Sequence, residues 1–352
     1  MSGFSINSSD KGGSRYNKSA KGPSRPKQKA ADRKKLPAKK QKRSKERRAM
    51  SRAELSTYAN ENGIKLPAKQ KKTKGLKAVI GYPNLVHAIQ NDFVKQINKG
   101  NKNSLLGLSA KPIKSALFYG PPGNGKAFIV NKVIKELGGN KFTLSTSTQS
   151  DDLTCDKDEA ILDLFKKARV KAKKTGKPSI VIVDEADRLL SDRDFLLDDE
   201  ANAQKALLKE ISSNKNKDVY TFLITNNPGD LDPTTIRTGI IDSKYEVDLP
   251  NEKDRAEILT HYLSKQPYQT YDKSRRSRQG VNIEEIAKKT EDYTVADLKE
   301  LVEIATRTAE DFGLEFIDKV SIDVALSKIQ RSLSDREIAY YEKSLRLFKR
   351  EE

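Results

Sequence analysis

The sequence of 352 residues has no tryptophan, one cysteine and two histidines. The single cysteine, Cys155, excludes a disulfide framework and favours a reducing compartment. Apolar runs are short, so we expect no bilayer-spanning segment, and the first residues lack the apolar core of a signal peptide. These absences favour a soluble intracellular protein of the cytoplasm, a nucleoid or a nucleus, with no membrane partner.

Acidic residues are scarce only in the N-terminal part of the chain. Residues 1–75 contain 23 Lys and Arg against 5 Asp and Glu, a net charge of +18, whereas the remainder contains 45 against 44. The first 50 residues have too few apolar side chains to offset the entropy of ordering, so we expect a disordered basic tail. Its densest block suits the phosphates of a nucleic acid, although a block like this also serves as a targeting signal or a solubilising tail. The candidate nucleic-acid contacts are Lys34, Lys35, Lys39, Lys40, Lys42, Arg43, Lys45, Arg47 and Arg48.

Some order is expected to begin at the end of the tail. Ser51 and Glu54 have the spacing of a capping box and predict a helix start. A Gly63-Ile64 turn, a lysine cluster and a second short apolar segment from Gly75 to Ile80 follow. This order resembles the SAP-type helix-extension-helix DNA-binding motif. The alternative is a linker with one marginal helix, because short isolated helices are barely stable in water.

The most informative stretch is Gly120-Pro-Pro-Gly-Asn-Gly-Lys126. It lies between an apolar run at 116–119, which predicts a strand, and a helical pattern at 128–137. Strand, glycine-rich turn, lysine and helix together predict a phosphate-binding loop. Glycines allow main-chain N–H groups to surround phosphates, and Lys126 would reach the outer ones. Ala127 stands where this motif has a Ser or Thr whose hydroxyl binds Mg²⁺.

Further strands are predicted after this loop. Segment 141–145 is predicted to be a short strand, and the mainly apolar segments 179–183 and 219–224 end at Asp184-Glu185 and at Thr225-Asn226. Strands that alternate with helices, with polar residues at their carboxyl ends, predict a doubly wound parallel α/β sheet with its ligand at that edge.

After Pro250 the pattern is helical only. It predicts helices over 252–263, 283–289, 295–312 and 335–347, with a mobile connection at 266–280. The expected organisation is therefore a basic tail (1–75), an α/β domain (76–249) and a small helical domain with a last helix (250–352).

With these motifs in order, the chain resembles the AAA subfamily of AAA+ ATPases from about Ile80 to Phe348. Gly120–Lys126 is similar to the family's Walker A motif and Ile180–Glu185 to its Walker B motif. Thr225-Asn226 resembles sensor 1, and the segment 231–239 resembles the arginine-finger segment. The turn at 293–298 resembles the Gly-Ala-Asp-Leu turn of the helical lid.

The resemblance implies ATP and Mg²⁺ as cofactors. It implies that Asp184 holds the Mg²⁺ shell and that Glu185 polarises the attacking water. It also implies that Asn226 orients this water or contacts the γ-phosphate, and that Arg237 reaches a neighbouring subunit's nucleotide. The nucleotide-binding residues that it implies are Ile80, Gly81, Pro122, Gly123, Asn124, Gly125, Lys126, Ala127, Phe128, Asp184 and Ala296.

Three positions depart from the family pattern. Ala127 lacks the hydroxyl, Ile240 replaces a second arginine finger, and the segment 152–155 lacks the aromatic residue of a substrate-gripping pore loop. The favoured hypothesis is an AAA-type ATP-binding protein with slow or impaired hydrolysis, associated with nucleic acid and assembling into a ring or partial ring. The alternatives are a non-hydrolysing nucleotide-dependent scaffold and an active protein remodeller whose basic tail is a targeting signal.

Overall fold

The computed structural model describes residues 52–67, 75–99, 113–145, 157–213, 217–237, 239–270 and 280–350. The nine candidate cations of the tail and the segment 152–155 lie outside these residues. The chain divides into a unit of residues 1–55 and a unit of residues 56–352. Apart from the first residues of one helix, everything below belongs to the second unit. None of the helices in the described ranges is long and apolar enough to span a bilayer.

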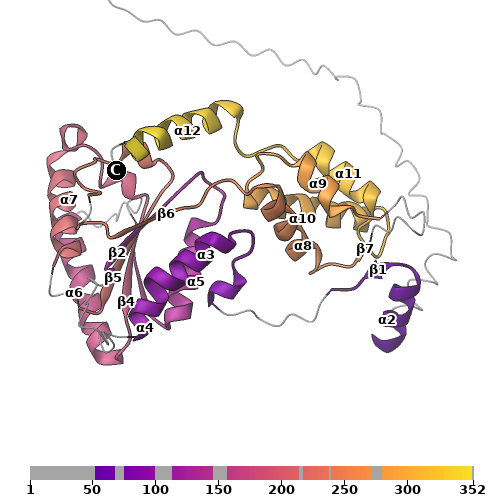
Figure 1. Cartoon of the computed structure of the whole chain (residues 1–352), viewed down its shortest axis with the longest axis horizontal. Coiled ribbons are helices and arrows are strands. Elements are labelled where there is room, and N and C mark those ends of the chain that lie inside the picture. The colour runs from indigo at the N-terminus through magenta and orange to yellow at the C-terminus, as the bar shows by residue number, and fades with distance from the viewer. Residues whose placement is uncertain are drawn as a thin grey trace, which may run out of the picture. The chain divides into compact units, whose positions relative to one another are not determined.

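A five-stranded parallel sheet forms the centre of the α/β part (Figure 1). Its strands are β2 (Ser115–Tyr119), β3 (Asn140–Ser145), β4 (Ser179–Asp184), β5 (Val219–Thr225) and β6 (Ser243–Glu246), in the order β3-β4-β5-β2-β6. Every residue of β2 and β5 is buried, as their apolar sequences predict for strands covered on both faces. The predicted parallel α/β sheet is therefore confirmed. The edge strand β6 escaped prediction because only Tyr245 of its four residues is buried.

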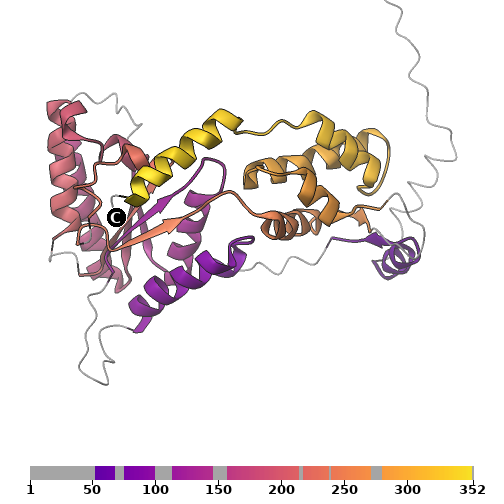
Figure 2. The same ribbon diagram turned by 45° about the horizontal axis from the view of Figure 1, so that its top comes forward.

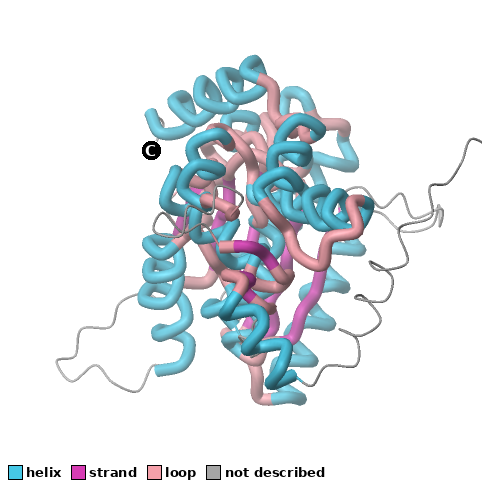
Figure 3. The backbone as a smooth tube through the Cα atoms, turned by 90° about the vertical axis from the view of Figure 1, so that its right-hand side faces the viewer, coloured by secondary structure: helices cyan, strands magenta, loops and turns pink. Residues whose placement is uncertain are grey.

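Helices cover both faces of the sheet (Figures 1 and 3). The first face carries α3 (Pro83–Ile89), a π-helical segment (Gln90–Val94), α4 (Lys95–Lys99) and α5 (Lys126–Leu137). The second face carries α6 (Lys157–Thr175) and α7 (Asp198–Ile211). The π-helical segment lies between α3 and α4 and contains Phe93 and Val94. Both of these side chains are buried in this π-helical turn. The Phe93 ring lies edge-on to Phe222, with ring centroids 4.9 Å apart.

The lid is the helical part that follows the sheet. Its helices α8 (Glu252–Leu263), α9 (Ile283–Lys289), α10 (Val295–Asp311) and α11 (Lys319–Lys328) share a separate apolar core. A capping box begins α10, because Thr294 Oγ1 accepts a hydrogen bond from Asp297 N and Asp297 Oδ2 accepts one from Thr294 N. α8, α9 and α10 lie close to the predicted ranges, whereas α11 was not predicted.

Two short strands join the N-terminal segment to the lid. β1 (Ile64–Lys65) pairs antiparallel with β7 (Tyr268–Gln269), which lies inside the segment predicted to be only a mobile connection. The helix predicted near Ser51 is present as α2 (Arg52–Glu61), but the next segment is a 3₁₀ turn at Gly75–Ala78, packed on α5. β1, which follows α2, contacts the lid, whereas the 3₁₀ turn contacts the α/β part. The segment from α2 to this turn therefore does not form one helix-extension-helix unit.

The last helix, α12 (Asp335–Arg350), leads from the lid back to the α/β part (Figure 2). Phe348 is 2% exposed in the core around α6 and α7, and its ring centroid lies 5.0 Å from that of Tyr119. Ser344 Oγ accepts a hydrogen bond of 2.9 Å from Gly229 N, and Lys349 pairs with Glu246 at 2.8 Å. The chain thus crosses from the sheet to the lid and returns to the sheet.

Candidate functional site

The phosphate loop, residues 120–126, is a turn that only glycine permits at several positions. Gly120 has φ +151°, and a Cβ atom there would lie 2.1 Å from the Val247 carbonyl oxygen. Gly123 and Gly125 have φ values of +82° and +83°, in the left-handed region that favours glycine. α5 begins at Lys126, and the first N–H groups of any α-helix have no carbonyl partner inside it. These groups and the positive end of the helix dipole make the loop an anion site.

Lys126 carries a positive charge in the wall of this loop. Its side chain is 6% exposed, and Nζ donates hydrogen bonds to the carbonyl oxygens of Gly120 (2.7 Å) and Pro121 (2.8 Å). Burial lowers the pKa of Lys126 to about 8, although Asp184 and Asp187 oppose this shift by favouring the ammonium form. An incoming anion would stabilise the ammonium form that burial destabilises in this way.

Acidic groups follow β4 at the same edge of the sheet. Asp184 ends the strand and is exposed, and Glu185 has a left-handed backbone with φ +52°. Arg188 Nε lies 3.2 Å from Glu185 Oε2, and Thr225 Oγ1 donates a 2.6 Å hydrogen bond to Asp187 Oδ1. Sequence reasoning missed Asp187 and Arg188, although both follow directly on the predicted Asp184-Glu185 pair.

Strand register brings Asn226 next to the phosphate loop. Tyr119 of β2 pairs with Thr225 of β5, so Gly120 and Asn226, the next residues of two adjacent parallel strands, lie side by side. Asn226 is exposed. The edge of the sheet therefore collects the loop, Asp184 and Asn226, as the strand-end pattern predicts.

The start of α10 bonds directly to the phosphate loop. Ala296 N donates to Gly123 O at 3.1 Å, and Val295 N donates to Asn124 Oδ1 at 3.4 Å. Asn124 is 1% exposed, and its Nδ2 has no hydrogen-bond partner among the described residues. The loop and the lid thus meet through hydrogen bonds from two main-chain N–H groups of α10, and the buried Asn124 Nδ2 donor is left over.

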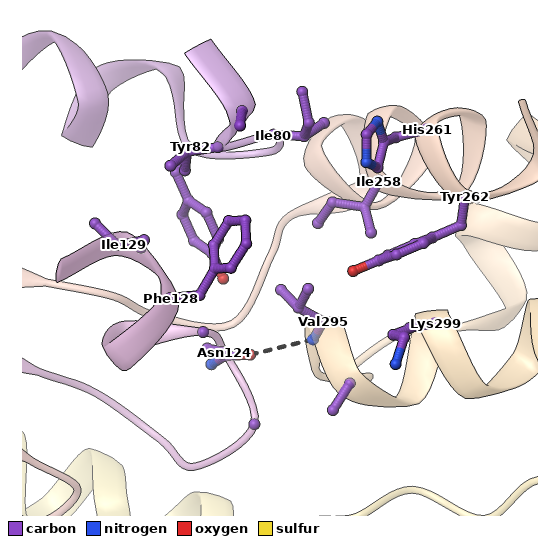
Figure 4. A pocket seen from close by; sticks show the side chains of 15 residues that line it. Ile80, Tyr82, Asn124, Phe128, Ile129, Ile258, His261, Tyr262, Val295 and Lys299 are labelled. Atoms are coloured by element: carbon purple, nitrogen blue, oxygen red, sulfur yellow. Dashed lines mark hydrogen bonds between the residues drawn. The ribbon is translucent and has the colours of Figure 1, made fainter. Parts of the chain in front are cut away.

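A cavity of about 200 Å³, the lid cavity, opens between these two parts (Figure 4). Six of the predicted nucleotide contacts line it: Ile80, Gly123, Asn124, Gly125, Phe128 and Ala296. From the lid come His261, Tyr262 and Lys299, and in Figure 4 the Tyr262 hydroxyl points toward the space in front of Phe128. Sequence reasoning assigned His261 no site role and missed the other two. The only signal for these residues in the sequence was the spacing of Ile258, His261 and Tyr262, which places them on one face of α8.

The remaining predicted residues lie elsewhere. Pro122, Lys126, Ala127 and Asp184 do not line the lid cavity, although three of them belong to the phosphate loop or follow it directly. Gly81 does not line the cavity either, but a Cβ atom there would lie 2.6 Å from Cδ1 of Ile258, which does. Arg237 is exposed and does not line the lid cavity.

These residues fit a nucleoside triphosphate. The loop offers unpaired amides and the Lys126 ammonium, the lid cavity has apolar and aromatic walls for a base, and Asn124 Nδ2 is a buried donor without a partner. Within the described residues no group of three or more His, Cys, Asp or Glu side chains is placed to hold a metal. Asp184 at the end of β4 offers a carboxylate, which suits Mg²⁺ that is bound mainly by phosphates and water.

The comparison with protein families agrees with this geometry. Residues 116–249 match the family model described as ATPase family associated with various cellular activities (AAA). Residues 116–249 form an AAA ATPase domain. ATP with Mg²⁺ is the standard cofactor pair of AAA ATPases.

Several curated relatives are similar to part of this chain. Cell division protein C of Sulfolobus acidocaldarius is 31% identical over 196 residues, covering 54% of this chain and 49% of that protein. The Cell division cycle protein 48 homolog of Archaeoglobus fulgidus is 28% identical over 258 residues, with 68% and 33% covered. The Proteasome-activating nucleotidase of Methanocaldococcus jannaschii is 30% identical over 233 residues, with 65% and 50% covered. This chain thus spans half or less of the length of each of these relatives.

The contact between Gly123 and the lid makes a first prediction. In Gly123→Ala the new Cβ would lie 2.9 Å from Thr294 Oγ1 and 3.1 Å from Thr294 Cβ. Thr294 is fully buried and caps α10, so it cannot turn away without losing that cap. We expect Gly123→Ala to weaken ATP binding by at least about tenfold, equivalent to about 1.4 kcal/mol, in a fluorescent-nucleotide titration.

Gly138→Ala is the matched control. Gly138 also has a left-handed φ, +60°, but nothing lies within 4 Å of its missing Cβ. This variant is expected to lose about 1 kcal/mol of unfolding free energy and no ATP affinity. Equal ATP affinities for Gly123→Ala and Gly138→Ala would contradict a role for the contact with the lid.

Proposed function

We propose that this protein binds ATP together with Mg²⁺ between the phosphate loop and the lid, and hydrolyses the ATP slowly. The observation that carries the proposal is the buried Lys126 ammonium, which among the described residues donates its hydrogen bonds to carbonyls of its own loop, beside a cavity of about 200 Å³. ATP supplies the anion for this charge, and its base suits the apolar walls of the lid cavity. The AAA domain and its relatives support the same assignment.

In this proposal each polar group at the sheet edge has a separate role. Lys126 and the amides of the loop bind the phosphates, Asp184 orients the Mg²⁺ shell and Glu185 accepts a proton from water. Asn226 orients that water from the adjacent strand end. When bound, Mg²⁺ would offset the charge of the outer phosphates. Phosphoryl transfer depends chiefly on such positioning, which strands buried on both faces provide.

Ala127 is the reason for proposing slow hydrolysis. It is the second residue of α5, it is exposed, and its side chain has no oxygen to offer a metal. Its carbonyl accepts a 2.6 Å hydrogen bond from Asn131 Nδ2, which holds this turn of the helix in place. Water would have to replace the missing ligand, and Mg²⁺ commonly keeps several waters. Nucleotide binding is therefore expected to survive while turnover is slow.

The pKa of Lys126 gives a direct test of ATP binding. Bound phosphates raise this pKa above the value of about 8 in the free protein, so the complex keeps a proton that the free protein loses as the pH rises. ATP affinity should be highest below pH 8 and fall by up to about tenfold per pH unit above it. Isothermal titration calorimetry over this range measures the effect.

Two variants separate this charge effect from a general loss of binding. Lys126→Arg keeps a permanent charge, so its ATP affinity, though lower, should lose the pH dependence. Lys126→Ala should lose most of its affinity at every pH. A wild-type affinity that is unchanged by the alanine substitution would remove the basis of the proposal.

The missing hydroxyl gives a second test, on the ATPase rate. Ala127→Thr adds the hydroxyl, and we expect a rate increase of about tenfold or more, because misplacement of reacting groups by about 1 Å can cost 10²-fold. Ala127→Val has the same shape without the hydroxyl and should leave the rate unchanged. Steady-state turnover and its Mg²⁺ dependence report both. Equal rates for the two variants would favour the alternative function, a nucleotide-dependent scaffold that does not hydrolyse ATP.

The proposal extends to two kinds of partner. Arg237 is exposed, which suits a role at the nucleotide of a neighbouring copy in a ring or partial ring. The charge of +18 in residues 1–75 suits a nucleic acid, with little dependence on its base sequence. A protein substrate that is remodelled, with the tail as a targeting signal, is the other candidate, and relatives such as the Proteasome-activating nucleotidase favour it.

Salt dependence tests the nucleic-acid partner. We expect the full-length protein to bind duplex DNA with log K falling against log salt by about 0.9 for each phosphate contact. Replacing the nine clustered tail cations by Gln should remove most of this slope. Gln at four exposed lysines of α6 is the control, and it should leave the slope unchanged: Lys166, Lys171, Lys173 and Lys174. An unchanged slope in the tail variant would assign the binding to the folded part or exclude this partner.

A further inference from the structure

A second cavity, the strand-end cavity, lies at the carboxyl edge of the sheet. It has a volume of about 460 Å³ and shares no lining residue with the lid cavity. One wall is formed by Pro121 and Pro122 of the phosphate loop, and another by Asn226 and the residue after it. The third wall is the first part of α12, which includes Arg336.

Two of these walls adjoin the groups that would bind the outer phosphates. Lys126 Nζ donates to the carbonyl oxygen of Pro121 at 2.8 Å, so the ammonium lies directly behind one wall. Asn226 follows the strand residue that pairs with Tyr119, which places it beside the first residue of the loop. The strand-end cavity is thus the space onto which the outer end of the phosphate loop opens.

The third wall is held in place at both ends of α12. Toward its C-terminus, Ser344 Oγ accepts from Gly229 N, three residues after Asn226, and Phe348 is buried in the core. Before its N-terminus, Ser332 N donates to Asp297 Oδ2 at 3.3 Å, which ties the helix to the capping box of α10. The part of α12 that carries Arg336 is therefore fixed over the strand ends.

Arg336 is a cation without a counterion in this wall. Nearby, Arg331 pairs with Asp292 and Asp335, Arg346 with Glu342, and Lys349 with Glu246. Arg336 is exposed and forms no ion pair within the described residues. Glu337, the carboxylate in the lining, already accepts hydrogen bonds of 2.7 Å from the amide and the hydroxyl of Ser334.

We infer that Arg336 binds the terminal phosphate of the nucleotide held by the phosphate loop of its own chain. This inference rests on the proposed function, since it needs a bound nucleotide. A guanidinium group presents planar N–H donors that match phosphate oxygens. The part of the lid that touches the loop, Val295 and Ala296, offers no cation. Arg336, which follows the lid in the sequence, supplies a cation, because α12 leads back to the sheet. Arg336 distinguishes ATP from ADP.

The test compares ATP and ADP affinities of full-length variants. Arg336→Ala should bind ATP about tenfold or more weakly than the wild type and ADP equally well, because the contact goes to the phosphate that ADP lacks. Arg336→Lys should recover part of the ATP affinity. Arg346→Ala removes a cation from the same helix outside the cavity, and it should change neither affinity. Urea unfolding of each variant verifies that α12 remains docked.

The outcomes separate the inference from the function on which it rests. A wild-type protein that binds neither nucleotide refutes the proposed function. A wild type that binds both, with Arg336→Ala losing neither or losing both equally, overturns the inference alone. An equimolar mixture of Arg336→Ala and Lys126→Ala chains tests whether the contact lies within one chain. Unrestored ATP affinity in the mixture supports the assignment, and restored affinity assigns Arg336 to a neighbouring copy instead.

Discussion

The hydrogen bond from Ala296 N to Gly123 O, at 3.1 Å, is the contact on which the rest of the site depends. It joins the phosphate loop to the first turn of α10 with no side chain between them, and the lack of a Cβ at Gly123 makes this approach possible. Thr294, which Gly123 faces, is fixed by its hydrogen bonds with Asp297, and Asp297 also accepts hydrogen bonds from Ser332 before α12. The loop, the lid and the last helix are therefore linked through a few buried groups. Nucleotide binding to the loop would therefore affect the loop, the lid and the last helix.

What the sequence predicts well is what short stretches determine by themselves. The phosphate loop and the strand ending at Asp184 follow from local apolar runs and from glycines at fixed spacing, and the structure contains them where expected. β6 was missed because an edge strand with one buried residue has no clear period. The connection at 266–280 was thought free of strands because its pairing partner, β1, lies some 200 residues earlier in the chain.

Contacts between distant segments explain the remaining differences. The amphipathic pattern of 335–347 predicts a helix correctly, but the pattern does not say that Phe348 packs against Tyr119 rather than against the lid. Tyr262 and Lys299 belong to helices that looked purely structural, and only the folded arrangement places them at the lid cavity. The roles assigned to Glu185, Asn226 and Arg237 remain predictions. Arg336 carried no motif, and its position became informative only once α12 was seen to return to the sheet.

The central claim is that the phosphate loop and the lid close together on one nucleotide. Hydrogen exchange followed by mass spectrometry, on the full-length protein with and without ATP and Mg²⁺, tests it most directly. If the claim is right, nucleotide slows exchange in peptides from the phosphate loop and in peptides covering residues 293–299 at the same ATP concentration. Protection of the phosphate loop with no change at residues 293–299 would contradict it.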